Sequence, residues 1–381
     1  MPLLHELVGF VDGSDVHQCP SQLIPTLRRY SKSILPGSEI IVSSKPELNY
    51  SIQDIAAPLR NLFSGTEVES SCALLPDLLF VVTIPVVESG QILIHGVLAH
   101  ELGHAIYDRH GIAKSLLPMI TVSEDMVKKL VPLMMNSQGK GAGAPSELGL
   151  RRKVTEEVTE RVNGWVKELC SDAIGIQLFG PALFFAATHL LTSFSRIDKA
   201  TETHPPARLR LRLMLRMLKQ RYPVNEWSEG LQSLCRNWDE VSSGPVSGTN
   251  HYDQIALETI NDAVLDFVTL ASESATSACA RYDGERFRND IAQLAPMFLN
   301  HIPPGEMPPY IGGVPVGLAS IINAGWHVYL CDFDKFRKSL HPKDGDTRFA
   351  AATKLHELVL KAIEISGIRI SWEEARRDSK R

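Results

Sequence analysis

The chain has 381 residues, a formal net charge of −5 at pH 7 and a hydrophobic fraction of 44%. These values are ordinary for a globular protein and exclude a disordered or fibrous chain. The slightly acidic balance argues against general binding to nucleic acids or to anionic membrane surfaces, because both need a basic protein surface.

The six cysteines are scattered and include no CxxC pair. A secreted disulfide framework would be denser, so we expect reduced thiols and a cytoplasmic protein. The N-terminus lacks a positively charged segment followed by a long apolar run, which argues against a signal peptide. The most apolar stretch, 178–194, is interrupted by Gly180, Pro181 and polar residues, so we expect a buried helix rather than a membrane span.

Strand signals are few along the chain, and the fold class that we expect is α+β, mostly α, with a small sheet. The length predicts about two domains, or one large domain with additions. We divide the chain into an N-terminal segment of unknown role (1–75), a core that carries the motifs described below (76–222) and a mainly helical C-terminal region (223–381).

The first clear element is a run of β-branched residues at 78–87, which predicts a strand. Pro85 makes this run an edge strand or marks its end. Apolar positions from 91 to 109 then follow a 3.6-residue period, and Gly111 is well placed just beyond the end of that helix. Further helices are expected at 151–179, 182–198 and 206–221, and loops at 136–149, 242–250 and 303–317.

His100, Glu101 and His104 form an HExxH motif on the helix expected at 91–109. Histidines at positions i and i+4 share one helix face, so both can bind one Zn²⁺ ion. Glu101 is rotated by about 100° from His100 and can lie beside the metal. There its carboxylate would take a proton from a water molecule whose pKa zinc has lowered. The alternative is a chance match on an ordinary helix, but the helical context favours metal binding.

A catalytic zinc site usually has three protein ligands and one open position, so two histidines are not enough. Glu168 and Asp172 share one face of the helix expected at 151–179, in an otherwise apolar stretch. Buried carboxylates need partners, because an unpaired one is costly. Zinc would serve Glu168, and the ring N–H of a metal-binding histidine would serve Asp172.

The combination of HExxH and ExxxD resembles the gluzincin metallopeptidases over about residues 78–222. The resemblance implies a zincin-like core in which His100, His104 and Glu168 are zinc ligands. It implies that Glu101 is the general base and that Asp172 orients a histidine. It also implies that the strand at 78–87 is an edge strand along the cleft, to which an extended peptide can pair.

Within this class, the chain is similar to the branch that contains CAAX prenyl proteases and heat-shock membrane peptidases. That branch has an HP-containing segment with a downstream arginine, which the run from Thr203 to Arg208 resembles. His204 and Arg208 are therefore candidates to stabilise the oxyanion. The alternative is that His204 precedes a helix that begins at the prolines and that Arg208 pairs with a carboxylate. Ser171 replaces the alanine of that branch, and no clear membrane span is present, so the resemblance extends to the site and not to a membrane substrate.

The function expected from these patterns is hydrolysis of peptide bonds in a protein or peptide substrate by a soluble zinc peptidase, with loop 136–149 as a lid. One alternative is a latent or regulatory zinc-binding module whose region 223–381 binds a partner protein. Another is hydrolysis of a non-peptide bond. The basic run 208–221 is expected to be a core helix whose arginines pair with acids, and not a nucleic-acid site. His95 and Cys170 are expected to have structural roles.

Overall fold

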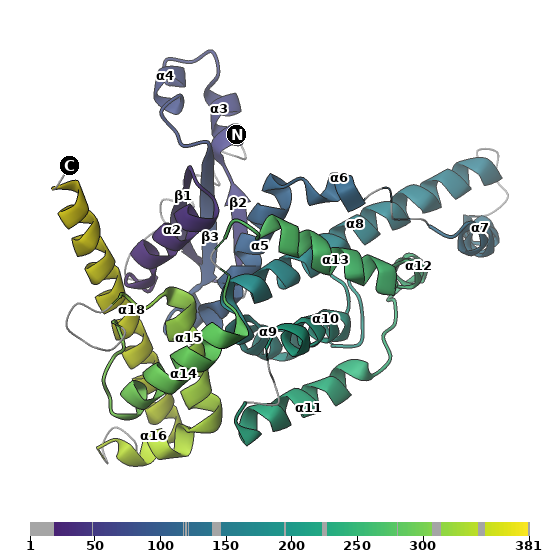
Figure 1. The fold of residues 1–381 in the computed structure, drawn as a ribbon. Coiled ribbons are helices and arrows are strands. Elements are labelled where there is room, and N and C mark those ends of the chain that lie inside the picture. The colour runs from purple at the N-terminus through teal and green to yellow at the C-terminus, as the bar shows by residue number, and fades with distance from the viewer. Residues whose placement is uncertain are drawn as a thin grey trace.

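Helices make up most of the fold, and one small sheet lies against them (Figure 1), which confirms the expected α+β, mostly α class. The computed structural model describes residues 19–47, 49–116, 118, 120, 122–138, 146–193, 196–222, 227–279, 281–306, 314–341 and 347–379. Within these ranges, no helix is both long enough and apolar enough to cross a membrane. The apolar stretch near Gly180 instead forms the buried end of one helix and most of the next.

The sheet has three strands in the order β1-β3-β2, namely β1 (Ser38–Lys45), β2 (Ser51–Asp54) and β3 (Leu78–Pro85). β3 pairs in parallel with β1 and antiparallel with β2. The prediction of an edge strand at 78–87 is therefore wrong. β3 is central and almost completely buried, which explains its apolar composition, and Pro85 only marks its end. β1 and β2 are the edge strands, and β2, from the N-terminal segment, is the one that contacts α5.

The helices before the middle of the chain are α2 (Leu23–Ile34), α3 (Ala56–Phe63), α4 (Glu69–Cys72), η1 (Val86–Glu88), η2 (Ile94–Val97), α5 (Leu98–Arg109), α6 (Ile112–Leu116), α7 (Glu124–Gln138), α8 (Glu147–Phe179) and α9 (Pro181–Ser193). Those that follow are α10 (Ala207–Arg221), α11 (Glu229–Ser243), α12 (His251–Thr259), α13 (Asp262–Ala275), α14 (Gly284–Leu299), α15 (Leu318–Cys331), α16 (Phe333–Ser339) and α18 (Arg348–Asp378).

The helix expected at 91–109 is shorter than predicted, because the chain first makes the tight turns η1 and η2 and enters α5 only at Leu98. Gly96 lies in the second turn, where a Cβ atom would be 3.0 Å from the Ala182 carbonyl oxygen. The turn therefore lets the backbone come close to α9. Gly111 follows α5 with φ +59°, as expected for a residue just past a helix.

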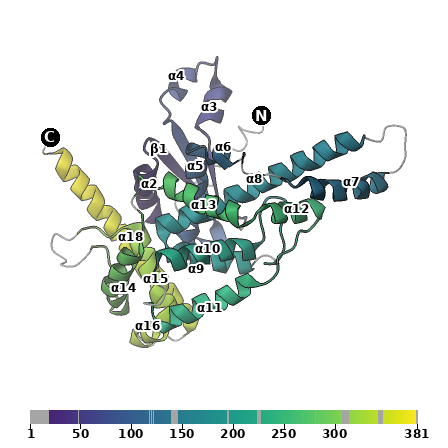
Figure 2. The same cartoon turned by 45° about the vertical axis from the view of Figure 1, so that its right-hand side comes forward.

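α8 is a 33-residue helix that begins at the side-chain cap Ser146 and ends before Gly180, whose φ is +61°. Its first turns project away from the body of the protein together with α7 (Figure 2). Half of the loop expected at 136–149, residues 139–145, lies outside the described residues, and its two ends belong to α7 and α8. Its role as a lid stays a prediction. The second half of α8 is buried in the core and packs against α5, α10 and α13.

α5 and α8 pack antiparallel, and two glycines allow their backbones to come very close. A Cβ atom at Gly103 would lie 2.6 Å from the Ser171 carbonyl oxygen, and one at Gly175 would lie 3.1 Å from the His100 nitrogen. Neither position therefore accepts a side chain without separating the helices. This contact places the motif of α5 directly against the acidic residues of α8.

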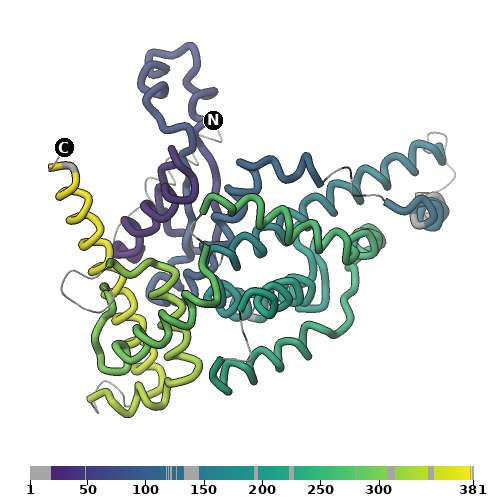
Figure 3. The backbone as a smooth tube through the Cα atoms, in the orientation of Figure 1, coloured from purple at the N-terminus to yellow at the C-terminus, as the bar shows by residue number. Residues whose placement is uncertain are grey.

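One cluster of buried apolar side chains runs through the whole described chain and includes Leu27 of α2, Phe179 of α8, Trp326 of α15 and Ile363 of α18. α18 lies beside α2, so segments from both ends of the chain meet (Figure 3). The helices after residue 222 thus share their core with the elements that carry the motifs. All three segments defined from the sequence contribute residues to this cluster, and Ile55, Ala56, Leu79 and Val81 form a second, smaller one.

The close contact of α5 with α8 predicts opposite effects for two alanine substitutions. Gly103→Ala should lower the free energy of unfolding by about 1–3 kcal/mol, because the new methyl group meets backbone atoms. Gly164→Ala, within α8, has no atom within 4 Å of its new Cβ and should raise it by roughly 0.5–1 kcal/mol. Urea denaturation measures both values, and equal stabilities for the two variants would contradict the packing described here.

Candidate metal centre

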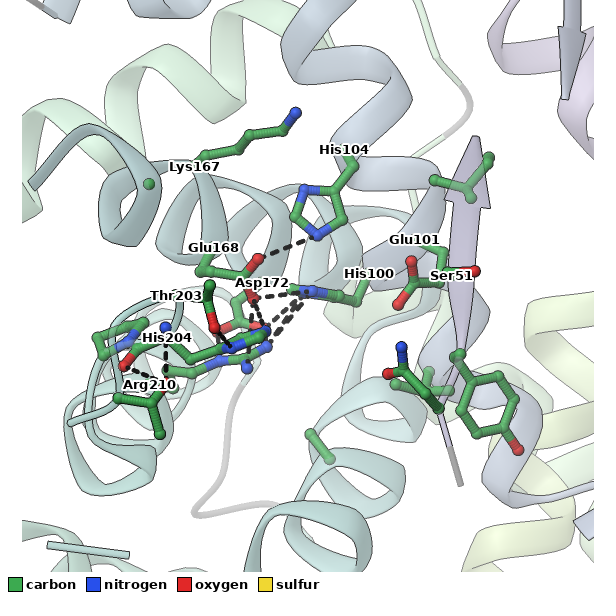
Figure 4. Close-up of a pocket in the computed structure, with 18 of the residues that line it drawn as sticks. Ser51, His100, Glu101, His104, Lys167, Glu168, Asp172, Thr203, His204 and Arg210 are labelled. Carbon is green, nitrogen blue, oxygen red and sulfur yellow. Dashed lines mark hydrogen bonds and ion pairs between the residues drawn. The ribbon is translucent and has the colours of Figure 1, made fainter. Parts of the chain in front are cut away.

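The α5–α8 contact brings the three predicted ligands to one point. His100 Nε2 lies 3.4 Å from Glu168 Oε2, and His104 Nε2 lies 3.3 Å from Glu168 Oε1. One ligand atom from each residue lies within 4.8 Å of the other two (Figure 4). A tetrahedral ion with bonds of about 2.0–2.1 Å holds its ligand atoms about 3.3 Å apart. The spacing of the three side chains therefore suits a small metal ion with nitrogen and oxygen ligands.

Asp172 lies behind His100, where the sequence analysis expected it. Its Oδ1 atom is 2.8 Å from His100 Nδ1. The ring N–H at Nδ1 therefore donates to this carboxylate, and Nε2 is left to face Glu168. Such a contact fixes the tautomer and the orientation of a metal-binding histidine.

Arg210 of α10 is the cation of this group, although the sequence analysis did not identify it. Its Nε and Nη2 atoms donate to the two oxygens of Asp172, both at 2.8 Å, and Nη1 lies 3.4 Å from Glu168 Oε2. The guanidinium is buried and holds both carboxylates in place. A bidentate contact of this kind fixes geometry as well as charge.

The placement of Arg208 beside the metal is corrected by the structure. Arg208 donates from Nη1 to the Pro245 carbonyl oxygen, 2.8 Å away on the other side of α10. α10 begins at Ala207, and both Ala207 and Arg210 line the cleft. Position 208 is rotated by about 100° from position 207 around the helix axis and therefore points away from the cleft. Counting helix faces from that start could have identified Arg210 in the sequence.

The charged side chains of the centre shift one another's pKa values. Burial alone would raise the pKa of Asp172, but the Arg210 guanidinium outweighs burial and lowers it to about 2. Burial also opposes the charge of His100, yet Asp172 raises the pKa of that imidazole to about 10. Burial and the charge of His100 together lower the pKa of His104 to about 3. A divalent cation would therefore have to displace the proton of His100 and would find His104 already neutral.

Glu101 is 8% exposed and lies in the same cleft, beside His100 (Figure 4). Burial raises the pKa of its carboxyl group, and the charge of Glu168 adds to this effect, although the charge of His100 opposes it. The result is a carboxyl group near the centre that holds a proton more readily than an exposed glutamate does.

His204 stands at the rim of the centre, in the loop before α10. Its Nε2 atom lies 3.6 Å from Glu168 Oε2, and its side chain is 53% exposed. Thr203 contacts the other ring nitrogen at 2.8 Å, and Thr201 accepts the His204 backbone N–H at 3.0 Å. Trp165 of α8 in turn donates to the Thr201 carbonyl oxygen. The loop is thereby tied to α8 with His204 next to Glu168.

The centre lies in a cleft of about 1080 Å³. β2 and the residues just before it form one wall, and the loop that carries His204 forms the opposite wall (Figure 4). β2 has four residues of mixed polarity and therefore no distinctive pattern in the sequence. β2 thus lies across the cleft from His204.

Buried hydrogen bonds of Tyr50 fix the start of the cleft wall that β2 forms. The Tyr50 hydroxyl lies 2.7 Å from Glu88 Oε2 and 2.9 Å from His95 Nδ1. These contacts connect the residue before β2 to the two tight turns that precede α5. Burial lowers the pKa of His95 to about 4, so the ring is neutral at pH 7.

The remaining expectations concern residues outside the centre. Cys170 is completely buried in the core, and burial raises the pKa of its thiol. Some arginines of the basic run pair with acids, as Arg216 does with Asp266 and Arg221 with Glu273. Arg208 and Arg212 instead donate to backbone carbonyl oxygens. Among the described residues, the group of His100, His104 and Glu168 is the one set of three or more histidines, cysteines or acids with metal-binding spacing.

Comparison of the chain with protein-family models, curated proteins and solved structures finds no significant match. The geometry of the centre is therefore the basis on which a function can be proposed.

Two arginines of α10 provide a matched test of the charge arrangement. Arg210→Ala should lower the free energy of unfolding by about 3–5 kcal/mol, because it leaves the buried Asp172 carboxylate without its cation. Arg208→Ala removes the same charge two positions away but only one hydrogen bond, and should cost about 0.5–1.5 kcal/mol. Urea denaturation compares them, with Arg210→Lys as a milder variant in case Arg210→Ala does not fold. Equal losses would contradict the role assigned to Arg210.

Proposed function

We propose that this chain is a zinc-dependent peptidase of the gluzincin type, with a zincin-like core formed by β2, α5 and α8. One observation carries the proposal. His100, His104 and Glu168 meet at metal-binding distances, with Glu101 beside them and Asp172 behind His100. A chance HExxH motif gives no reason for an acidic pair sixty-odd residues later to meet it in this order.

Zinc is the metal that the ligand set favours. Two imidazole nitrogens and one carboxylate oxygen are typical of catalytic zinc sites, whereas Ca²⁺ and Mg²⁺ prefer oxygen ligands. The ligands face an open cleft, which leaves room for water and substrate. When bound, zinc would polarise the scissile carbonyl group and lower the pKa of a water molecule.

Glu101 is the residue that we assign to proton transfer. Its carboxyl group lines the cleft near the ligands. Because Glu101 is rotated by about 100° from His100 on α5, we assign it the role of a base and not that of a ligand. Burial raises its pKa, which suits a group that accepts a proton from water and then delivers it to the leaving amine.

His204 is the candidate for stabilising the oxyanion. Partial burial lowers the pKa of its ring, which favours the neutral imidazole. When the Thr203 hydroxyl donates to Nδ1, the ring proton is on Nε2, the nitrogen that lies 3.6 Å from Glu168. An N–H donor at that position could stabilise negative charge that develops beside the metal.

The edge of β2 supplies the binding surface for a peptide backbone. β2 uses one edge to pair with β3, and its residues line the cleft. An extended peptide can add to such an edge as a further strand. In this proposal β2 takes the role that the sequence analysis gave to the strand at 78–87.

The first test separates metal binding from turnover. Glu101→Gln should keep its zinc and lose roughly 10²–10⁴-fold in the rate of casein cleavage, because it removes the base and not a ligand. His104→Ala should lose both zinc and activity. Zinc is measured by elemental analysis, and cleavage is measured with and without o-phenanthroline.

Glu156→Gln is the matched control, because Glu156 pairs with Arg152 on the surface and does not line the cleft. Full activity of the Glu101→Gln variant would contradict the proposal. Zinc at full occupancy without chelator-sensitive cleavage would favour the latent zinc-binding module instead.

A further inference from the structure

An exposed glycine lies in the interior of α8. At Gly164 the helix carries a residue that is less stable there than alanine, because glycine loses more backbone freedom on folding. Glycines in other helix interiors have a packing reason, since a Cβ atom at Gly103, Gly175 or Gly325 would lie 2.6, 2.5 or 2.7 Å from an atom of another element. At Gly164 no atom lies within 4 Å of that position. Packing within the described chain therefore gives no reason for this glycine.

Gly164 faces the cleft that contains the metal centre. It lines this cleft together with Glu168, which lies one turn further along the same face of α8. Glu160, one turn before Gly164, lines the cleft as well, so the cleft continues along α8 beyond the proposed ligands. Four helical residues correspond to about 6 Å, and Gly164 therefore lies about 6 Å along the helix axis from Glu168.

The long side chains next to Gly164 are held by partners on other helices. Lys167 donates to Asp108 of α5 at 2.8 Å. Arg161 pairs with Asp253 of α12, whose side chain is completely buried. Because these ion pairs lie three positions before and after Gly164, neither charged side chain is free to fill the space above the glycine. The gap at Gly164 is therefore a fixed feature of the α8 surface in the cleft.

The loop that carries His204 is also fixed close to this gap. Trp165, the residue after Gly164, donates to the Thr201 carbonyl oxygen at 3.2 Å. Both Thr201 and Gly164 line the cleft. The gap thus lies beside a wall that is anchored to the same turn of α8.

The distance from Glu168 to Gly164 can be compared with the length of a peptide. An extended chain rises about 3.3 Å per residue, so a peptide that leaves the metal centre along α8 reaches Gly164 about two residues from the scissile bond. At that point a glycine lets the peptide main chain come closer to α8 than any other residue would. A side chain at position 164 would occupy the space that the peptide needs.

We infer that Gly164 is a specificity-determining residue, whose missing side chain makes room for the substrate main chain about two residues from the scissile bond. The inference rests on the proposed peptidase function and adds a length requirement to it. On one side of the cleaved bond, the substrate must be long enough to pass over Gly164. Substrate binding then explains a glycine that weakens α8 and that packing does not require.

Peptides that share one scissile bond and differ in length test the inference. The bond is chosen by mapping the cleavage of denatured casein, and the peptides are extended stepwise on either side of it. In the wild-type protein, kcat/KM should rise when the second residue is added on one side. Gly164→Leu should remove this rise and lower kcat/KM for long peptides by about tenfold or more, with little effect on the shortest. Gly164→Ala should lower it less, and its higher stability excludes unfolding as the cause.

Gly149→Leu is the matched control, because Gly149 is an exposed glycine of the same helix and does not line the cleft. A Cβ atom there would lie 3.3 Å from the Ser146 hydroxyl oxygen, which belongs to a side chain that can shift. This variant should cleave long and short peptides at wild-type rates. A wild-type rate that does not rise with length, an unchanged rise in Gly164→Leu, or an equal loss at all lengths would overturn the inference and leave the peptidase function standing.

Binding of peptides to the Glu101→Gln variant separates the two claims further. A long labelled casein peptide should bind more tightly than versions of it shortened from one end, and Gly164→Leu in the same background should remove this difference. That result without cleavage by the wild-type protein would support the role of Gly164 and contradict the peptidase. Equal binding of the long peptide and of versions shortened from either end would overturn the role of Gly164.

Discussion

The antiparallel contact between α5 and α8 is the constraint on which the metal centre depends. Gly103 and Gly175 let the two backbones approach to distances at which a side chain at either position would clash. Each helix carries its reactive residues four positions apart, as a stripe along one face. Because the helices run in opposite directions at this short separation, His104 meets Glu168 while His100 meets Asp172. A wider helix separation would move the ligands out of reach of one ion.

The same contact creates an electrostatic requirement. Glu101, Glu168 and Asp172 are close together and largely buried, and Arg210 is the permanent cation among them. With all three carboxyl groups ionised, one guanidinium leaves two negative charges, and buried charges without partners are costly. Protonation of His100 offsets part of this excess, which explains why its pKa is raised. A divalent cation at the three ligands would balance the remainder, so the stability of the fold and the affinity for metal are connected.

The residues of the candidate metal centre could be predicted from the sequence because each pair lies within one helix, where spacing determines the face. The sequence also predicted α8, α10 and α9, although α9 ends at Ser193 and the helix expected there extended to residue 198. The sequence analysis failed where position depends on contacts between distant segments. β2 is recognisable only from its pairing with β3. Arg210 differs from Arg208 in a local way, because the two residues lie on different faces of a helix that begins at Ala207. Tyr50, which contacts Glu88 and His95 below the cleft wall, has no local signal at all.

The claim that α5 and α8 jointly hold one metal ion can be tested most directly by crystallography of the purified protein at the zinc absorption edge. The account predicts a single strong anomalous peak within about 2.0–2.2 Å of His100 Nε2, His104 Nε2 and a carboxylate oxygen of Glu168. A protein without such a peak after incubation with zinc, or with zinc bound by other residues, would contradict it.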